Sequence, residues 1–277
     1  MTATSPPARP AARPGRPGRS RPLAWDLARS EWIKLRTVRS TYWALLLTPA
    51  GMAGLGALLT AAYVRHHEAA RHGFDPAGYS LSGFFLAQLA IIVLGVIVIT
   101  SEYTTGSIRS TFAAAPQRTG ILAAKAAVIG AVAVTAGIAS AFAAFFTGQA
   151  LLAGKGLGTT IGAPGALRSV LGAGLYLAVL GLLALGLGSL IRRTAGGIAA
   201  AIGLIVILPV LVQGLPASWQ AALTRYLPSV AGQAVIGRTK FAAPGPVLSP
   251  WAGFALFCGY TAVVLITAAF TLHRRDT

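Results

Sequence analysis

The sequence predicts an all-α polytopic membrane protein with six transmembrane helices and no soluble domain of its own. Of the 277 residues, 55% are hydrophobic and only 10% are charged, against roughly 25% charged in an ordinary soluble domain. A helix needs about 20 apolar residues to cross a hydrocarbon layer of about 30 Å. Six apolar blocks reach this length, at residues 41–64, 81–100, 122–152, 169–191, 195–213 and 251–272.

The chain begins with a segment that is not expected to fold. Residues 1–22 contain six Pro and five Arg without apolar periodicity, so they cannot bury enough apolar surface to offset the entropy of ordering. We predict a disordered basic cytoplasmic tail. The first apolar block begins near Thr41 and is too long for a signal peptide, which makes it a membrane anchor.

Residues 23–40 predict an interfacial helix ahead of the first span, with a plain juxtamembrane linker as the alternative. At helical spacing one face carries apolar side chains, and Arg29, Lys34 and Arg36 lie mostly elsewhere. The side chains on the predicted apolar face are Trp25, Ala28, Trp32 and Leu35.

Residues 41–277 then form the predicted transmembrane domain. The third block is longer than a membrane requires, and the fourth and fifth are separated only by the segment 192–194, which predicts a tight hairpin. Pro209 can bend the fifth span. Small residues four positions apart, such as Gly174/Ala178 and Ala184/Gly188, allow helices to approach closely.

The distribution of basic residues predicts the orientation. Residues 1–40, 101–125 and 192–193 and the C-terminal tail together hold 16 Lys and Arg, and residues 65–80, 153–168 and 214–250 hold seven. The positive-inside rule therefore favours cytoplasmic locations for both termini. Because the basic residues flank apolar blocks, the net charge of +17 indicates membrane orientation and not nucleic-acid binding. The abundance of Arg, Ala and Gly suggests a GC-rich bacterial genome, and hence the bacterial cytoplasmic (inner) membrane.

Several kinds of chemistry are not supported by the sequence. The apolar cores contain no Asp, Glu or His, and Lys125 is their only ionisable residue well inside a block. This disfavours proton carriage and intramembrane hydrolysis. Residues 148–156, GQALLAGKG, do not match a phosphate-binding P-loop, and the lone Cys258 suggests neither a disulfide nor a metal site. We therefore expect no catalytic residue, no metal and no enzyme activity.

The loop between the second and third blocks predicts a short amphipathic helix on the cytoplasmic surface. Gly106 changes the chain direction, Ser107 can cap a helix, Ile108 and Phe112 share one face, and Pro116 stops it. Glu102 is the only acidic residue in this loop, and Arg109 and Arg118 follow it. The alternative is a well-capped hairpin with a solvated ion pair.

Four motifs, in order around the six blocks, resemble bacterial permeases of the ATP-binding-cassette (ABC) type-2 family. They are EWIKLRT at 31–37, EYTTGSIRSTF at 102–112, SLIRRTAGG at 189–197 and YLPSVAG at 226–232. The resemblance covers nearly the whole chain after the tail. It implies a six-helix half-transporter that forms a homodimer, or a heterodimer with a second permease, and docks separate ABC ATPase subunits.

The resemblance also assigns roles to residues. The connecting helix at the membrane lipid surface would include Trp25, Glu31, Trp32 and Lys34. The coupling helix would lie at Gly106–Ala115, and the residues that contact the ATPase would be Glu102, Tyr103, Gly106, Ile108, Arg109 and Phe112. This chain would bind no cofactor itself, because ATP and magnesium would be on the partner ATPase.

The last external segment, 214–250, resembles a partly re-entrant region before the sixth span, with a surface loop as the alternative. Its candidate external-gate residues are Trp219, Leu223, Tyr226 and Leu227. The implied function is ATP-driven export of a hydrophobic or amphipathic substrate such as a drug, lipid or peptide, with unknown substrate-binding residues. The alternatives are a non-transporting scaffold or sensory subunit and an ion-gradient-driven carrier.

Overall fold

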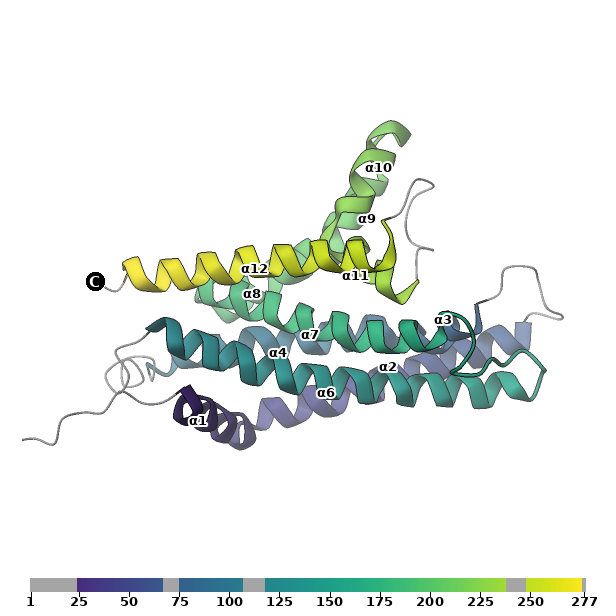
Figure 1. Cartoon of the computed structure of the whole chain (residues 1–277), viewed down its shortest axis with the longest axis horizontal. Coiled ribbons are helices and arrows are strands. Elements are labelled where there is room, and N and C mark those ends of the chain that lie inside the picture. The colour runs from purple at the N-terminus through teal and green to yellow at the C-terminus, as the bar shows by residue number, and fades with distance from the viewer. Residues whose placement is uncertain (1–23, 67–74, 107–117, 238–247, 276–277) are drawn as a thin grey trace, which may run out of the picture.

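The computed structural model describes residues 24–66, 75–106, 118–237 and 248–275, and within these ranges all regular structure is helical. Most of the long helices run side by side in one bundle (Figure 1). Their bounds are α1 Ala24–Thr37, α2 Arg39–His66, α3 Pro76–Ser80, α4 Phe84–Thr104, α6 Arg118–Ala153, α7 Ala166–Ile191, α8 Thr194–Ile202, α9 Leu208–Gln213, α10 Ala217–Leu223, α11 Pro228–Gln233 and α12 Pro250–Arg275.

The predicted class, an all-α membrane protein with six spans, is confirmed. Within the described residues, six helical segments are long and apolar enough to cross a membrane. They are Thr41–Arg65, Pro76–Thr104, Gly120–Ala153, Ala166–Ile191, Thr194–Gln213 and Pro250–Leu272. Each contains most of one predicted block. Apolar runs of this length predict membrane spans because they are stable where lipid replaces water.

The helix α7 lies at the centre of the bundle, packed against α4, α6 and α12. Its most apolar stretch is 72% buried within the chain, whereas those of the fifth and sixth spans are each only 22% buried. In the core the Tyr176 ring lies 5.0 Å from the rings of both Phe84 and Phe257. The chain thus forms a compact centre and leaves broad apolar faces on its outer spans.

Small residues on α7 allow this close packing, as their spacing predicted. A Cβ atom added at Gly174 would lie 2.7 Å from the backbone nitrogen of Ile138 on α6, and one at Gly188 would lie 3.2 Å from the Cα of Val96 on α4. These glycines therefore pack helices of the same chain against one another.

The fifth span changes direction near Pro209. Between α8 and α9 the residues Gly203–Ile207 form a π-helical turn, and Pro209 is the second residue of α9. Proline cannot donate the helical hydrogen bond and its ring crowds the carbonyl four residues earlier, which widens the turn. After this bend α9 and α10 point away from the bundle, and α11 returns to pack against α12 (Figure 1).

Candidate functional site

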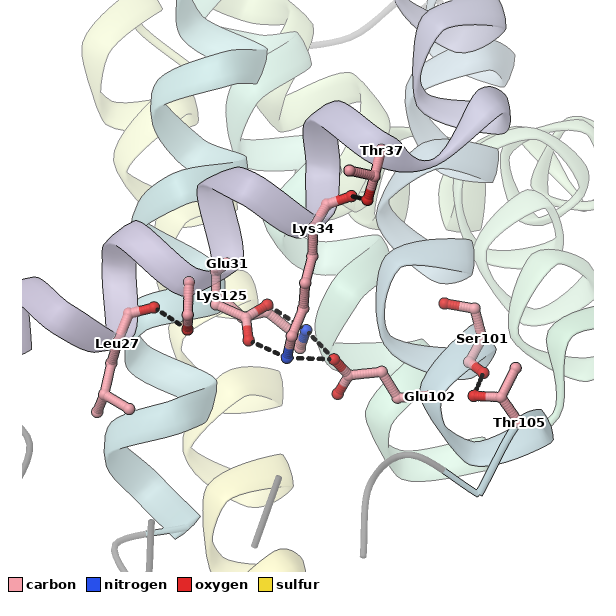
Figure 2. A network of polar contacts seen from close by, with 9 residues as sticks. Leu27, Glu31, Lys34, Thr37, Ser101, Glu102, Thr105 and Lys125 are labelled. Atoms are coloured by element: carbon pink, nitrogen blue, oxygen red, sulfur yellow. Dashed lines mark hydrogen bonds and ion pairs between the residues drawn. The ribbon is translucent and has the colours of Figure 1, made fainter. Parts of the chain in front are cut away.

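Four charged side chains from three helices meet near the ends of α4 and α6 that flank residues 107–117. Glu31 and Lys34 come from α1, Glu102 from the last turn of α4, and Lys125 from the start of α6. Figure 2 shows α1 crossing beside the other two helices with its acidic and basic side chains directed at theirs. We call Glu31, Lys34, Glu102 and Lys125 the charge cluster, and the end of the bundle that holds it the α1 end.

Each lysine in the charge cluster contacts both carboxylates. The Lys34 Nζ lies 2.7 Å from Glu31 Oε1 and 3.0 Å from Glu102 Oε1. The Lys125 Nζ lies 2.9 Å from Glu102 Oε1 and also donates to Glu31 Oε2. The cluster carries two positive and two negative charges, so it is neutral as a whole and complete only when all three helices are in place.

Three of the four side chains in the charge cluster are buried, so each charge there needs an oppositely charged partner. The side chains of Lys125, Glu31 and Glu102 are 2%, 5% and 9% exposed, whereas that of Lys34 is 43% exposed. Removing one partner of a buried ion pair costs roughly 3–5 kcal/mol because the remaining charge is left without compensation. The charge cluster therefore fixes the position of α1 relative to α4 and α6.

The local sequence of α1 explains how it presents these charges. Glu31, Lys34 and Leu35 fall on one side of the helix, and Leu35 packs with Val128, Ile129 and other side chains of α6. An apolar contact thus places the carboxylate of Glu31 beside Lys125. The rest of the α1 surface is left to solvent or lipid.

The residues of the predicted apolar face of α1 differ in burial. Leu35 is buried and Ala28 half-buried, but Trp25 and Trp32 are exposed. At helical spacing Arg29 and Arg36 lie beside the two tryptophans, whereas the sequence prediction placed these arginines mostly elsewhere. The bundle buries the side of α1 that carries Glu31, because the Glu31 carboxylate pairs with Lys34 and Lys125 there.

Lys34 remains charged in this environment. Partial burial by itself would lower the pKa of its ammonium, but hydrogen bonds from Lys34 to Glu31 and Glu102, together with their negative charges, raise the pKa above the ordinary value. The protonated form therefore predominates up to strongly alkaline pH.

Glu102 does not form the solvated ion pair of the alternative prediction. Glu102 is buried and pairs with Lys34 and Lys125. The side chains of Arg109 and Arg118 lie outside the described residues, as do those of Ile108 and Phe112. Among the predicted coupling residues, the structure places Glu102 in the charge cluster, Tyr103 beside it on α4, and Gly106 on the surface just beyond α4.

Tyr103 connects the same end of α4 to the hairpin between the fourth and fifth spans. The Arg192 guanidinium lies over the Tyr103 ring, 5.3 Å from its centroid. Arg192 ends α7 with a φ of 59°, a left-handed conformation that is uncommon for a residue other than glycine. Nearby, Thr194 Oγ1 donates to Thr100 Oγ1 at 2.9 Å. One side of α4 thus contacts the charge cluster, and another contacts this hairpin.

The candidate gate residues lie away from the charge cluster, between the fifth and sixth spans. Trp219 and Leu223 are exposed on α10, and Tyr226 is exposed after it. Leu227 is instead buried where the chain returns to α11. The Tyr260 hydroxyl donates to the Tyr226 carbonyl at 2.9 Å, which fastens this segment to α12.

Lys125 is the site residue that sequence reasoning did not include. It was recognised as the ionisable residue inside a span, and such residues usually have an oppositely charged partner. The whole sequence contains only six acidic residues, so Glu31 and Glu102 could have been found as candidate partners. The small number of acidic residues was therefore the signal in the sequence that could have pointed to these partners.

Comparison with protein families identifies the chain. A family model described as ABC-2 family transporter protein matches residues 25–277, which covers α1 and all six spans. No curated protein matches the sequence. The motifs, the six spans and the matched range agree, and the chain belongs to the ABC-2 family of transporter proteins.

Proposed function

We propose that the chain is the membrane-spanning permease subunit of an ATP-driven ABC exporter. It would use ATP and magnesium bound to separate ATPase subunits, because its own sequence has no P-loop. The observation that carries the proposal is the charge cluster, which joins α1 to the two helices that lead into and out of residues 107–117.

In this mechanism the ATPase docks on the segment around residues 102–112. Movement of the docked ATPase displaces the ends of α4 and α6, and the buried ion pairs oblige α1 to move with them. The contact between Arg192 and Tyr103 carries the same movement to the hairpin of α7 and α8. These connected helices would act as one lever that changes the access to a substrate cavity.

We further propose a dimer in the bacterial cytoplasmic membrane with both termini in the cytoplasm. The fifth and sixth spans bury little of their apolar surface within the chain, so a second permease copy or a related permease can pack there. A mostly apolar interface of this kind suits a hydrophobic or amphipathic substrate, such as a drug, a lipid or a peptide.

Docking can be tested through the apolar face of the coupling segment. Replacing both Ile108 and Phe112 with Asp would place charge against an apolar surface of the ATPase, and burying an uncompensated charge costs several kcal/mol. We expect normal membrane insertion but loss of ATPase co-purification and of substrate-stimulated ATP hydrolysis. Normal co-purification and hydrolysis would exclude this segment as the main docking element.

An ion-gradient-driven carrier is the second candidate, because the charge cluster does contain buried carboxylates. Its position at one end of the bundle favours coupling over proton carriage, which needs a group reached from both sides of the membrane. Vesicles containing the chain alone, subjected to a pH gradient, distinguish the two. Transport in these vesicles would support the carrier, whereas transport only with the ATPase and ATP supports the exporter.

A further inference from the structure

The helix α1 carries a stripe of alternating aromatic and basic residues on the side opposite the charge cluster. Trp25, Arg29, Trp32 and Arg36 follow one another at steps of four, three and four residues, which places them along one face of a helix. All four are exposed, Trp25 by 75% and Trp32 by 45%. We call these four residues the Trp–Arg stripe.

The Trp–Arg stripe lies next to the point where the chain enters the membrane. The first span begins at Thr41, directly after α1 and the short break at Val38. Tyr42 and Trp43, in the first turns of this span, are also exposed, and the Tyr42 hydroxyl donates to the Arg36 carbonyl at 2.7 Å. Exposed aromatic side chains therefore occur both on α1 and at the start of α2, where the chain enters its first span and aromatic residues favour the lipid headgroups.

The charge on this surface is predominantly positive. Arg29, Arg36 and Arg39 are exposed here, and Asp26 is the one exposed acidic residue of α1. Glu31, the other acidic residue of α1, is turned inward to Lys34 and Lys125. Because the carboxylate of Glu31 is occupied in the charge cluster, it does not neutralise the arginines of the outer face.

We infer that the Trp–Arg stripe binds the headgroups of anionic phospholipids. The Arg guanidinium groups match phosphate oxygens with paired hydrogen bonds, and Trp rings favour the boundary between headgroups and acyl chains. Anionic lipid would thus hold α1 from outside, while the charge cluster holds it from inside. This inference requires only that α2 spans the membrane, and it stands whether or not an ATPase docks.

The test uses a probe placed within the stripe. In the Cys258→Ala background, Ile33→Cys carries an environment-sensitive dye, because Ile33 is exposed beside the stripe. The full chain is reconstituted in phosphatidylcholine nanodiscs with increasing fractions of phosphatidylglycerol. We expect a saturable dye response, and Arg29→Gln with Arg36→Gln should weaken the apparent affinity for phosphatidylglycerol by about 25-fold, since each basic residue near an anionic surface contributes about fivefold.

The matched control is Arg65→Gln with Arg168→Gln, which removes the same charge from exposed positions at the other end of the bundle. This variant should respond like the parent, and inorganic phosphate added to pure phosphatidylcholine discs should give no response. An equal loss in both double variants, or no loss in either, would overturn the proposal. A response to phosphate alone would assign the site to free anions, and a response only in discs with two copies would assign the face to subunit contact.

Discussion

The two ends of α6 are fastened to the rest of the bundle by different chemistry. Near its start, Lys125 joins α6 to α1 and α4 through buried ion pairs. Near its other end, Gln149 uses neutral groups: its Nε2 donates to Ser80 Oγ at 2.9 Å and to the Pro76 carbonyl at 3.2 Å, and its Oε1 accepts from Thr159 N at 2.6 Å. Both sites fix helix positions, but only the first depends on charge balance.

Under the proposed function, this chemical contrast favours the α1 end as the one that responds to the ATPase. A neutral hydrogen-bond network loses a modest free energy when one member is removed, whereas a buried charge without its partner is costly. The α1 end therefore has few intermediate states: either all three helices are engaged or an uncompensated charge remains. Such an end can transmit a displacement, and the neutral end can serve as a fixed point.

The largest effect is expected for Lys125→Met. It leaves Glu31 and Glu102 with only the partly exposed Lys34, so we expect a loss of roughly 3–5 kcal/mol in the free energy of unfolding, measured as a lower thermal midpoint in nanodiscs. Lys155→Met, at an exposed position, is the control. Equal stability of the two variants would remove the distinction between the two ends.

Combining Lys125→Met with Glu31→Gln sharpens this comparison. The double variant keeps the ion pair between Lys34 and Glu102 and has no unbalanced charge, so it should be more stable than Lys125→Met alone. Additive losses would contradict charge balance as the organising feature, because residues in one network are expected to couple.

A smaller loss is expected for Glu102→Gln, about 1.5–3 kcal/mol, the contribution of hydrogen bonds to charged groups. Gln retains an acceptor but leaves two lysines facing one carboxylate. This exceeds the value of at most about 1 kcal/mol for an exposed ion pair, which would apply if Glu102 were solvated. If coupling runs through this residue, substrate-stimulated ATP hydrolysis should fall while ATPase co-purification persists.

At the opposite end, Gln149→Leu tests the neutral network. It removes three hydrogen bonds and leaves the Thr159 amide without this acceptor, so we expect a loss of about 1–3 kcal/mol. Gln213→Leu, at an exposed position on α9, is the control. ATP hydrolysis should be less affected than in Glu102→Gln at comparable stability. A larger effect in Gln149→Leu would contradict the assignment of coupling to the α1 end.

The smallest effect is expected for Lys34→Met, because its side chain is 43% exposed and water screens its pairs to about 1 kcal/mol or less. Hydrogen bonds to Glu31 and Glu102 raise the pKa of Lys34 against the opposing effect of burial. Its contribution is therefore complete below the ordinary lysine pKa and lost only as the pH rises through the raised value. The stability difference between parent and variant should be constant from pH 6 to 9.

The membrane class, the six spans and the helix ahead of them could be predicted from the amino-acid sequence. These features depend on properties summed along the chain: apolar runs long enough for lipid, and a helical period near the first span. The family resemblance added the expectation that residues near 31–37 and 102–112 serve related roles. The resemblance did not predict that residues of these two segments contact each other.

The pairing of the charged residues and the face of α1 that turns inward could not be predicted, because both depend on how the helices pack. Lys125 meets Glu31 across 94 residues and Glu102 across 23, and no local pattern records these distances. After Pro209 the resemblance predicted a partly re-entrant segment, with a surface loop as the alternative, and the return of the chain at α11 depends on contacts with α12. The physical reason is that apolar transfer acts residue by residue, whereas ion pairing in a buried site depends on where three packed helices place their side chains.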